Sequence, residues 1–374
     1  MRICIAAASS LDGSGYATRI QSMLDAYVDR FEVSVVHFRF DSELELPAAY
    51  TDRLDYRPVL LRHRTRLDHL SLLPPLAAAI AQSSGNFSSS LDVLQVEGVQ
   101  LWPLWSEAPA VRRVLVMHDD ERMRMARLAH SSRTVTGRLA CAAMAWKCGR
   151  LQLRAVREAD ETWFVSRVEM NRLGGDARAA VCVPNGAPSE LFAVPTLAGT
   201  EAPVLAFVGP AAYQANAEAV DWLTRAVWPA VRRAVPEAEL RLVGRGWDSL
   251  APVEGVTVRG YAARLDEELR QARVVVAPLL AGGGTKLKVI EGMAAARPVV
   301  TTSIGAEGIP PSPGLIAADQ AERMAAEVVR LLTDRRAASD LGAQNRAAVA
   351  ALRWEAIWDS AVARLEGERE LCQA

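Results

Sequence analysis

Apolar runs of strand length alternate with longer segments of helical period along the chain. In the first half, segments 16–30 and 134–158 have helical period. The runs that predict strands are RICIAAA (2–8), VSVVHF (33–38), DVLQV (92–96), RVLVMH (113–118), TWFVS (162–166) and AVCV (180–183). Because these runs are apolar on both faces and alternate with helices, they predict a parallel sheet covered by helices.

The alternation pauses over 184–203, which holds four prolines and two glycines and has no clear period. This composition predicts an interdomain linker. The alternation then resumes, with strands expected at 204–209, 239–244, 256–260, 274–278 and 298–302. Helices are expected at 216–234, 264–272, 286–296, 319–333 and near 354–370. The pattern predicts two consecutive α/β domains, over 1–195 and 196–354.

Composition agrees with two domains and narrows the classes of function. A chain of 374 residues suits two domains of ordinary size. Basic and acidic residues nearly cancel, with 43 Lys+Arg against 44 Asp+Glu, whereas a nucleic-acid binder usually carries a basic excess. The apolar stretch 70–81 contains two prolines and is shorter than the roughly 20 residues of a bilayer-spanning helix. We therefore expect neither nucleic-acid binding nor insertion across a membrane.

The N-terminal sequence and the cysteines point to the cytoplasm. The apolar run at 2–8 is short and is followed closely by Asp12, which favours a first strand over a signal peptide. The five cysteines form no CxxC pair. We therefore expect no disulfide framework and no zinc site, and a reducing compartment.

Charge is uneven within the first domain. Residues 121–157 carry nine Lys+Arg and a single acid, Glu121. The structural alternative is a solvated helix face near acids elsewhere in the chain. The functional alternative is a basic face toward a phosphorylated acceptor or an anionic membrane surface, which would make the protein peripheral at the inner membrane face.

The segment most suggestive of chemistry is VVVAPLLAGGGTKLKVIEGMAAARPVVTTSIGAEGI (274–309). An apolar strand precedes three glycines, Gly282 to Gly284, and we expect Thr285 to cap the helix that follows. Ligands of open α/β sheets bind beyond the carboxyl ends of the strands. Glycines let backbone amides approach such a ligand, and a helix N-terminus favours phosphate. The segment predicts a phosphate-binding loop.

Two of the three lysines of the chain, Lys286 and Lys288, lie in this segment. Lys288 and Glu291 are three residues apart and share a helix face, which by itself is typical of a surface ion pair. The functional hypothesis places Lys288 on a diphosphate and Glu291 on two adjacent sugar hydroxyls, because a carboxylate can accept both protons. We favour the functional hypothesis, since position and residue type agree.

These features resemble the donor site of retaining glycosyltransferases of family 4, which have the GT-B fold of two Rossmann-like domains facing across a cleft. The similarity covers the C-terminal domain well and the N-terminal domain in patches. Beyond 274–309, it extends to DGSGYATRIQSMLDAYVDRFEVSVVHF (12–38), RVLVMHDDE (113–121), VPNGAPSELF (183–192) and FVGPAAYQANAEAVDWLTRAVWPAVRRAVPEAELRLVGRG (207–246). The resemblance implies that a C-terminal helix, 355–374, packs back on the N-terminal domain.

The resemblance also implies roles for single residues. Glu291 matches the second glutamate of the family's paired-glutamate motif, expected on the donor ribose, while Gly283 stands where the first would be. Pro210 and Asn216 occupy the region where the family places diphosphate-binding Arg and Lys. We expect the donor site to contain Gly15, Asn216, Arg245, Tyr261, Gly283, Gly284, Thr285, Lys286, Leu287, Lys288 and Glu291.

His118 ends an apolar strand and matches the family's cleft histidine. The resemblance implies that it orients the donor sugar or stabilises charge near the anomeric carbon, while the leaving diphosphate draws the acceptor proton in a front-face attack. Lys288 and Glu291 complete the expected catalytic set. Asp119 and Arg122 are candidates for acceptor binding, and a solvated turn is their structural alternative. For Tyr261, a base contact stands against a half-buried loop aromatic.

The sequence therefore predicts a hexosyltransferase-type enzyme that moves a sugar, with retention, from a UDP-, GDP- or dTDP-sugar to a saccharide, lipid-linked or small-molecule acceptor. Such a reaction belongs to polysaccharide or natural-product biosynthesis. We expect no cofactor and no metal, because no DxD pair lies in a suitable loop and the nucleotide-sugar is a substrate. The alternatives are a nucleotide-sugar epimerase or phosphorylase on the same fold, and a non-catalytic nucleotide-sugar-binding protein.

Overall fold

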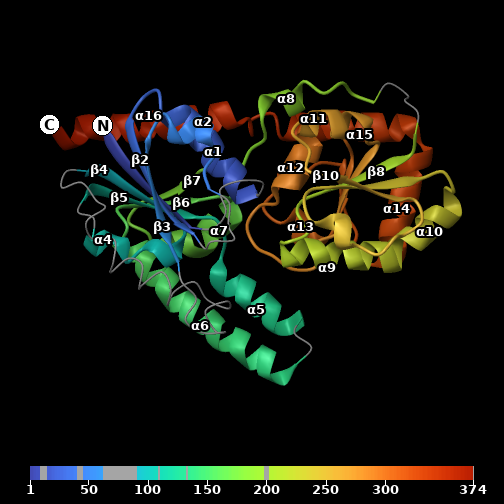
Figure 1. Cartoon of the computed structure of the whole chain (residues 1–374), viewed down its shortest axis with the longest axis horizontal. Helices are drawn as coiled ribbons and strands as arrows, with labels where there is room; N and C mark the ends of the chain where they lie inside the picture. Colours follow the sequence, from blue (N-terminus) through green and yellow to red (C-terminus); the bar gives the residue numbers. More distant parts are fainter. Residues whose placement is uncertain are drawn as a thin grey trace. The chain divides into compact units, whose positions relative to one another are not determined.

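A computed structural model describes residues 1–8, 15–39, 45–61, 91–107, 110–131, 134–197 and 202–373. The apolar stretch 70–81 and residues 198–201 of the expected linker lie outside these ranges. The chain divides into two compact units, Met1–Pro184 with Trp358–Ala374, and Asn185–Ile357. Figure 1 labels the elements of both units.

Unit 1 is built on a seven-stranded sheet in which every pair of neighbouring strands is parallel, in the order β3-β2-β1-β4-β5-β6-β7. The central strands are almost fully buried. The strands are β1 (Arg2–Ala8), β2 (Glu32–Arg39), β3 (Asp55–Leu60), β4 (Leu91–Glu97), β5 (Ala110–Met117), β6 (Glu161–Phe164) and β7 (Ala180–Cys182). The helices are α1 (Gly15–Tyr27), α2 (Ala48–Thr51), η2 (Val99–Leu101), α4 (Leu104–Glu107), α5 (Glu121–Ser131), α6 (Val135–Glu158), α7 (Arg167–Leu173) and η3 (Gly174–Asp176).

Unit 2 is built on a six-stranded sheet, also parallel throughout, in the order β10-β9-β8-β11-β12-β13. The strands are β8 (Val204–Val208), β9 (Glu239–Val243), β10 (Val256–Gly260), β11 (Val274–Ala277), β12 (Val299–Thr301) and β13 (Leu315–Ala317). The helices are α8 (Ser189–Phe192), α9 (Gln214–Trp222), η4 (Leu223–Val227), α10 (Trp228–Ala234), η5 (Trp247–Ser249), α11 (Leu265–Gln271), α12 (Leu287–Ala294), α13 (Ser303–Ala306), α14 (Ala321–Thr333) and α15 (Arg335–Ala348).

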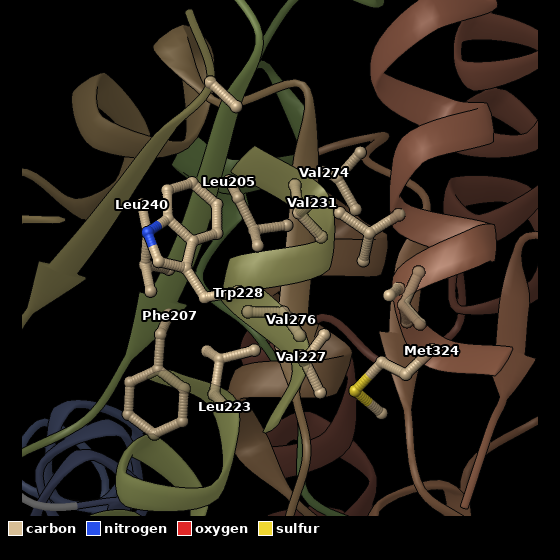
Figure 2. Close-up of a cluster of buried hydrophobic side chains, with 14 of the residues drawn as sticks. Leu205, Phe207, Leu223, Val227, Trp228, Val231, Leu240, Val274, Val276 and Met324 are labelled. Atoms are coloured by element: carbon tan, nitrogen blue, oxygen red, sulfur yellow. The ribbon is translucent and has the colours of Figure 1, made fainter. Parts of the chain in front are cut away.

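The core of unit 2 lies between the sheet and helices from two parts of the sequence. Phe207 and Val276 from the strands pack with Trp228 near the start of α10 and with Met324 from α14 (Figure 2). All four side chains are fully or almost fully buried. Burial on this face fixes α9, α10 and α14 against the sheet and leaves the carboxyl ends of the strands for loops.

The fold confirms the prediction of two parallel-sheet Rossmann-like domains, with local differences. The helix predicted over 216–234 contains a π-helical segment, η4, before Pro229 near the start of α10. Proline lacks a backbone N–H and disturbs the regular ladder there, which accounts for the interruption. Strands β3 and β13 were not predicted, because both lie at sheet edges and are only partly buried.

The segment expected to be a linker is mostly structured. Residues 185–197 belong to unit 2, where Ala187, Leu191 and Phe192 join a buried cluster. The backbone N–H of Ala187 donates to Leu352 O over 2.8 Å. A glycine is needed at position 186, because a Cβ there would lie 2.7 Å from Leu352 O. This segment is therefore anchored within unit 2.

Helix α16 (Trp354–Gln373) begins in unit 2 and continues in unit 1 from Trp358 onward. The Trp358 indole is buried, and its Nε1 donates to Ser22 Oγ on α1 over 2.9 Å. The guanidinium carbon of Arg19 lies 4.9 Å from the centre of the same ring. The last helix is thus an integral part of unit 1. Among the described helices, none combines the length and apolar character needed to span a membrane.

Candidate functional site

The glycine loop and the helix start predicted from the sequence lie at the carboxyl end of β11. Gly282 and Gly284 have φ angles of 123° and 59°, which favour glycine over any residue with a Cβ. Helix α12 begins at Leu287, with Lys286 at its N-cap position. The prediction that Thr285 caps this helix is therefore wrong. Thr285 precedes the N-cap position, and its hydroxyl oxygen accepts a hydrogen bond of 2.8 Å from Asn185 Nδ2 instead of one from the helix backbone.

The Lys286 ammonium faces the glycine loop itself. Its Nζ donates to the carbonyl oxygens of Gly283, over 2.8 Å, and Gly284. The side chain is buried, and its aliphatic part passes 3.6 Å from where a Cβ on Gly282 would lie. Lys286 thus braces the loop and contributes positive charge beside it.

Lys288, in the first turn of α12, reaches across to helix α9. Its Nζ donates a hydrogen bond of 2.5 Å to Asn216 Oδ1 and lies 4.2 Å from the centre of the Phe207 ring. Asn216 is buried, and its Nδ2 donates to Pro210 O over 2.8 Å. Two of the predicted donor-site residues, Lys288 and Asn216, are therefore in direct contact.

Burial dominates the electrostatics of Lys288 and Glu291. Desolvation lowers the pKa of Lys288 to about 7, with Glu291 acting in the opposite direction and Lys286 adding to the decrease. Desolvation likewise raises the pKa of Glu291 to about 7 against the influence of Lys288. A strongly perturbed acid–base pair beside a helix N-terminus is typical of a ligand-binding site. An anion bound here would favour the charged form of Lys288.

The ends of β8 and β9 lie so close to each other and to the Lys288–Asn216 contact that two positions require glycine. Gly209 follows β8 with a φ of 140°, and a Cβ there would lie 2.6 Å from Asn216 Nδ2 and 2.8 Å from Lys288 Nζ. Gly244 follows β9 with a φ of 144°, and its Cβ would lie 2.3 Å from Gly209 O. Backbone hydrogen bonds from Gly209 N to Val243 O and from Gly244 N to Gly260 O join the ends of β8, β9 and β10. Gly209 therefore lets the backbone after β8 contact Lys288, and Gly244 lets the backbone after β9 contact Gly209.

Arg245 and Tyr261, two further candidates, stack on each other. The guanidinium carbon of Arg245 lies 4.3 Å from the centre of the Tyr261 ring, a cation–π contact. The Tyr261 side chain is 54% exposed. Arg245 follows β9 and Tyr261 follows the neighbouring strand β10, so the two residues form an exposed aromatic and cationic platform at the carboxyl edge of the sheet.

Sequence reasoning missed two residues at the glycine loop. Asn185 is one, because its contact with Thr285 joins positions 100 residues apart and leaves no local signal. Tyr213 is the other: its hydroxyl lies 3.6 Å from where a Cβ on Gly282 would be, and its side chain is half exposed. The sequence signal for Tyr213 was its place in the loop between β8 and α9, at a strand's carboxyl end.

In unit 1, His118 follows β5 and contacts the last residue of the neighbouring strand β4. His118 Nε2 lies 2.7 Å from Glu97 Oε2. The Tyr16 ring packs edge-on against the imidazole with 4.9 Å between ring centres, and its hydroxyl donates to Glu97 O over 3.3 Å. The prediction singled out His118 without Glu97, although Glu97 also ends an apolar strand. The contact fixes the position of the imidazole.

The Glu97 carboxylate is buried within a polar cluster. Burial acts to raise its pKa, but the hydrogen bond and charge of His118, the charge of Arg19 and the hydrogen bond from Gln95 outweigh it, so the pKa lies below the usual value. Gln95 Nε2 donates to Glu97 Oε1 over 2.5 Å. Glu97 is thus held as a carboxylate that can orient the histidine.

The remaining candidates of unit 1 have structural contacts. Gly15 is the first residue of α1. The Arg122 side chain packs over Gly149 of α6, with its Cδ 3.0 Å from the position of a Cβ there. Asp119 Oδ2 lies 3.8 Å from Arg124 Nε. These contacts agree with the structural alternative for Asp119 and Arg122, and acceptor binding stays a prediction. Within the described ranges, no cluster of three or more His, Cys, Asp or Glu residues could hold a metal ion.

Comparison with protein-family models connects the site of unit 2 with a known family. Residues 202–334 match the model described as glycosyl transferases group 1, and they include the β8–β13 sheet, the glycine loop and Lys288. This region is similar to the glycosyl transferases group 1 domain. Together with the fold of the whole chain, this match indicates that the protein is a glycosyltransferase enzyme. The curated protein sequences that were compared gave no match.

Solved structures show that the GT-B fold extends over the whole chain. Sucrose-phosphate synthase from Thermosynechococcus elongatus is 18% identical with a TM-score of 0.70, over 100% of both chains. HepE from Anabaena, solved with UDP and glucose, is 14% identical with a TM-score of 0.66, over 98% of this chain and 100% of that one. A TarM mutant from S. aureus, solved with fondaparinux, α-GlcNAc-glycerol and UDP, is 11% identical with a TM-score of 0.69, over 98% and 100%. At these identities, the likeness concerns the fold.

Proposed function

We propose that this glycosyltransferase moves a sugar from a nucleoside-diphosphate sugar to a hydroxyl of a saccharide, lipid-linked or small-molecule acceptor, with retention of anomeric configuration. The observation that carries the proposal is the Lys288 ammonium in the first turn of α12, which is held by Asn216 and follows the glycine loop. A diphosphate leaving group needs a local positive charge and backbone hydrogen-bond donors. The lysine supplies the charge, and the free N–H groups of the helix N-terminus supply the donors.

Unit 2 binds the donor in this proposal. The diphosphate contacts Lys288 and the first turn of α12, while the Glu291 carboxylate accepts hydrogen bonds from the ribose hydroxyls. The exposed Arg245–Tyr261 stack offers a π-face to the base. Because HepE and the TarM mutant were solved with UDP, we propose UDP as the first nucleotide to test.

Unit 1 supplies the acceptor site and His118. His118, positioned by Glu97, orients the donor sugar and stabilises the charge that develops near the anomeric carbon. The bond between the anomeric carbon and the diphosphate oxygen breaks as the acceptor oxygen bonds on the same face. The leaving diphosphate takes the acceptor proton. Lys288 and the α12 dipole neutralise the leaving group, so activity should survive a chelator.

The test is an assay of UDP-glucose and other nucleotide-sugars with a panel of saccharide and lipid acceptors. Transfer with an α-anomeric product from an α-linked donor, seen by NMR, supports the proposal, and a β-product contradicts retention. Conversion of the donor without an acceptor indicates an epimerase, and a requirement for orthophosphate indicates a phosphorylase. Binding of UDP without turnover across the panel indicates a non-catalytic binding protein.

A further inference from the structure

Helix α6 carries three large apolar side chains that are exposed to solvent. Val135, Leu139 and Trp146 are 71%, 68% and 66% exposed. Their spacing of four and seven residues brings them onto one face of the helix, since both intervals are close to whole numbers of turns. In Figure 1 the α5–α6 pair extends away from the sheet of unit 1. The three side chains therefore line up along one face of α6, and we call this set the α6 stripe.

The α6 stripe is flanked by basic side chains. Arg138, Lys147 and Arg150 are exposed on the same helix, and the guanidinium carbon of Arg150 lies 5.1 Å from the centre of the Trp146 ring. The sequence from Val135 to Arg157 contains no Asp or Glu. The one acid of α5, Glu121, accepts a hydrogen bond of 2.5 Å from Arg124 Nη2. The exposed part of this hairpin thus combines apolar and cationic groups.

These properties distinguish the kinds of partner that the hairpin fits. A second copy would bring two strongly basic faces together, which electrostatic repulsion opposes. A soluble phosphorylated saccharide satisfies the cations but leaves Leu139 and Trp146 in water. An anionic bilayer surface satisfies both, because a Trp and aliphatic side chains enter the interface while Lys and Arg meet the lipid phosphates.

We propose that the α6 stripe, with Arg138, Lys147 and Arg150, is a docking surface for an anionic phospholipid membrane. The helix lies in the interface plane with Val135, Leu139 and Trp146 toward the acyl chains. Binding is reversible and salt-sensitive, since part of it is electrostatic. The proposal concerns unit 1 alone and stands independently of the transfer reaction proposed above.

The experiment is co-sedimentation of the full chain with vesicles of phosphatidylcholine alone, and of phosphatidylcholine with one third phosphatidylglycerol. We expect binding to the anionic vesicles that weakens as salt is raised. The double variant L139S/W146S and the triple variant R138E/K147E/R150E should each weaken binding about tenfold or more. V168S, at another exposed apolar side chain of unit 1, and R336E, at an exposed arginine of unit 2, are the matched controls and should bind like the wild type.

Three results would overturn the proposal: no binding to anionic vesicles, equal binding to both vesicle types, or an equal loss in the control variants. Wild-type dimers that L139S/W146S abolishes in sedimentation velocity, without vesicle binding, would assign the stripe to self-association. Circular dichroism and UDP binding should be unchanged in all variants, because the altered side chains are exposed and outside unit 2's donor site. That readout separates a failure of this proposal from a failure of the proposed function.

Discussion

Lys288 Nζ and Asn216 Oδ1 lie 2.5 Å apart and join the first turn of α12 to α9. Both side chains also pack against Gly209, so closely that a Cβ at that position would touch each of them. The ammonium is thus held by a neutral amide rather than by a carboxylate. A neutral partner orients Lys288 without cancelling its charge, so the charge remains available to an anion.

UDP affinity should fall as the pH rises above about 7. The pKa of Lys288 is lowered to about 7 by burial, so the free protein loses this proton in the neutral range. A diphosphate binds the charged form, and binding above pH 7 must therefore take up a proton. We expect the dissociation constant, measured by calorimetry from pH 7 to 9, to rise by up to about tenfold per pH unit.

The variant K288M should weaken UDP binding at pH 7 and reduce this alkaline dependence. Its matched control is K147M, at an exposed lysine of α6 in unit 1, which should keep both the affinity and the pH profile. A K288M protein that binds UDP as the wild type does would exclude Lys288 from the diphosphate site.

Replacing Gly209 by alanine should damage both stability and UDP binding. The residue has a φ of 140°, and the new Cβ would lie 2.6 Å from Asn216 Nδ2 and 2.8 Å from Lys288 Nζ. Backbone strain of this kind costs about 1–3 kcal/mol of folding free energy. The displaced Lys288 should also weaken binding. G175A is the control, because no atom lies within 4 Å of the added Cβ, and it should leave both urea denaturation and UDP binding unchanged.

Replacing Glu97 by glutamine should slow turnover without weakening the binding of UDP alone. The amide keeps the shape of the side chain but loses the charge that holds His118. A misplaced imidazole should reduce kcat about 10- to 100-fold. If E97Q and H118A act through one contact, the double variant should be no slower than H118A. Additive losses would show that the two residues act separately. E158Q, at an exposed glutamate of α6, is the control variant for turnover.

The E97Q variant also tests how the stability of the protein depends on pH. The pKa of Glu97 is lower in the folded protein than its usual value of 4.5, so the unfolded chain takes up this proton more readily. The stabilisation is therefore present above pH 4.5 and is lost as the pH falls through the folded-state pKa. Urea denaturation of the wild type should show this loss, and E97Q should lack this part of it. An identical pH dependence in both proteins would contradict the assignment.

The sequence predicted the layers of the fold well because buried parallel strands leave a strong signal. Runs such as VVVAP at 274–278 are apolar on both faces, and they became the central strands. Edge strands such as β13 (Leu315–Ala317) are short and half buried, so their pattern does not stand out. Helix α15 (Arg335–Ala348) was missed because its buried face is built from small residues, Ala338 and Gly342 among them.

At the candidate site, the sequence singled out residues but did not predict their partners. Lys286 and Lys288 are two positions apart and were expected to do similar work, yet one braces the glycine loop and the other contacts Asn216. Contacts between distant positions, such as Asn185 with Thr285 or Glu97 with His118, depend on which strands become neighbours. Strand order is a property of the tertiary fold, and no local pattern encodes it.

The last helix should be needed for the stability of unit 1. Trp358 is 1% exposed, donates a hydrogen bond to Ser22, and packs under the guanidinium of Arg19. W358A should remove these contacts and leave a large cavity, at a cost of about 3–5 kcal/mol. The chain offers a matched control in Trp146, which is 66% exposed, and W146A should change the free energy of unfolding by less than about 0.5 kcal/mol. Urea denaturation followed by far-UV circular dichroism measures both, and equal effects of the two substitutions would contradict a structural role for α16 in unit 1.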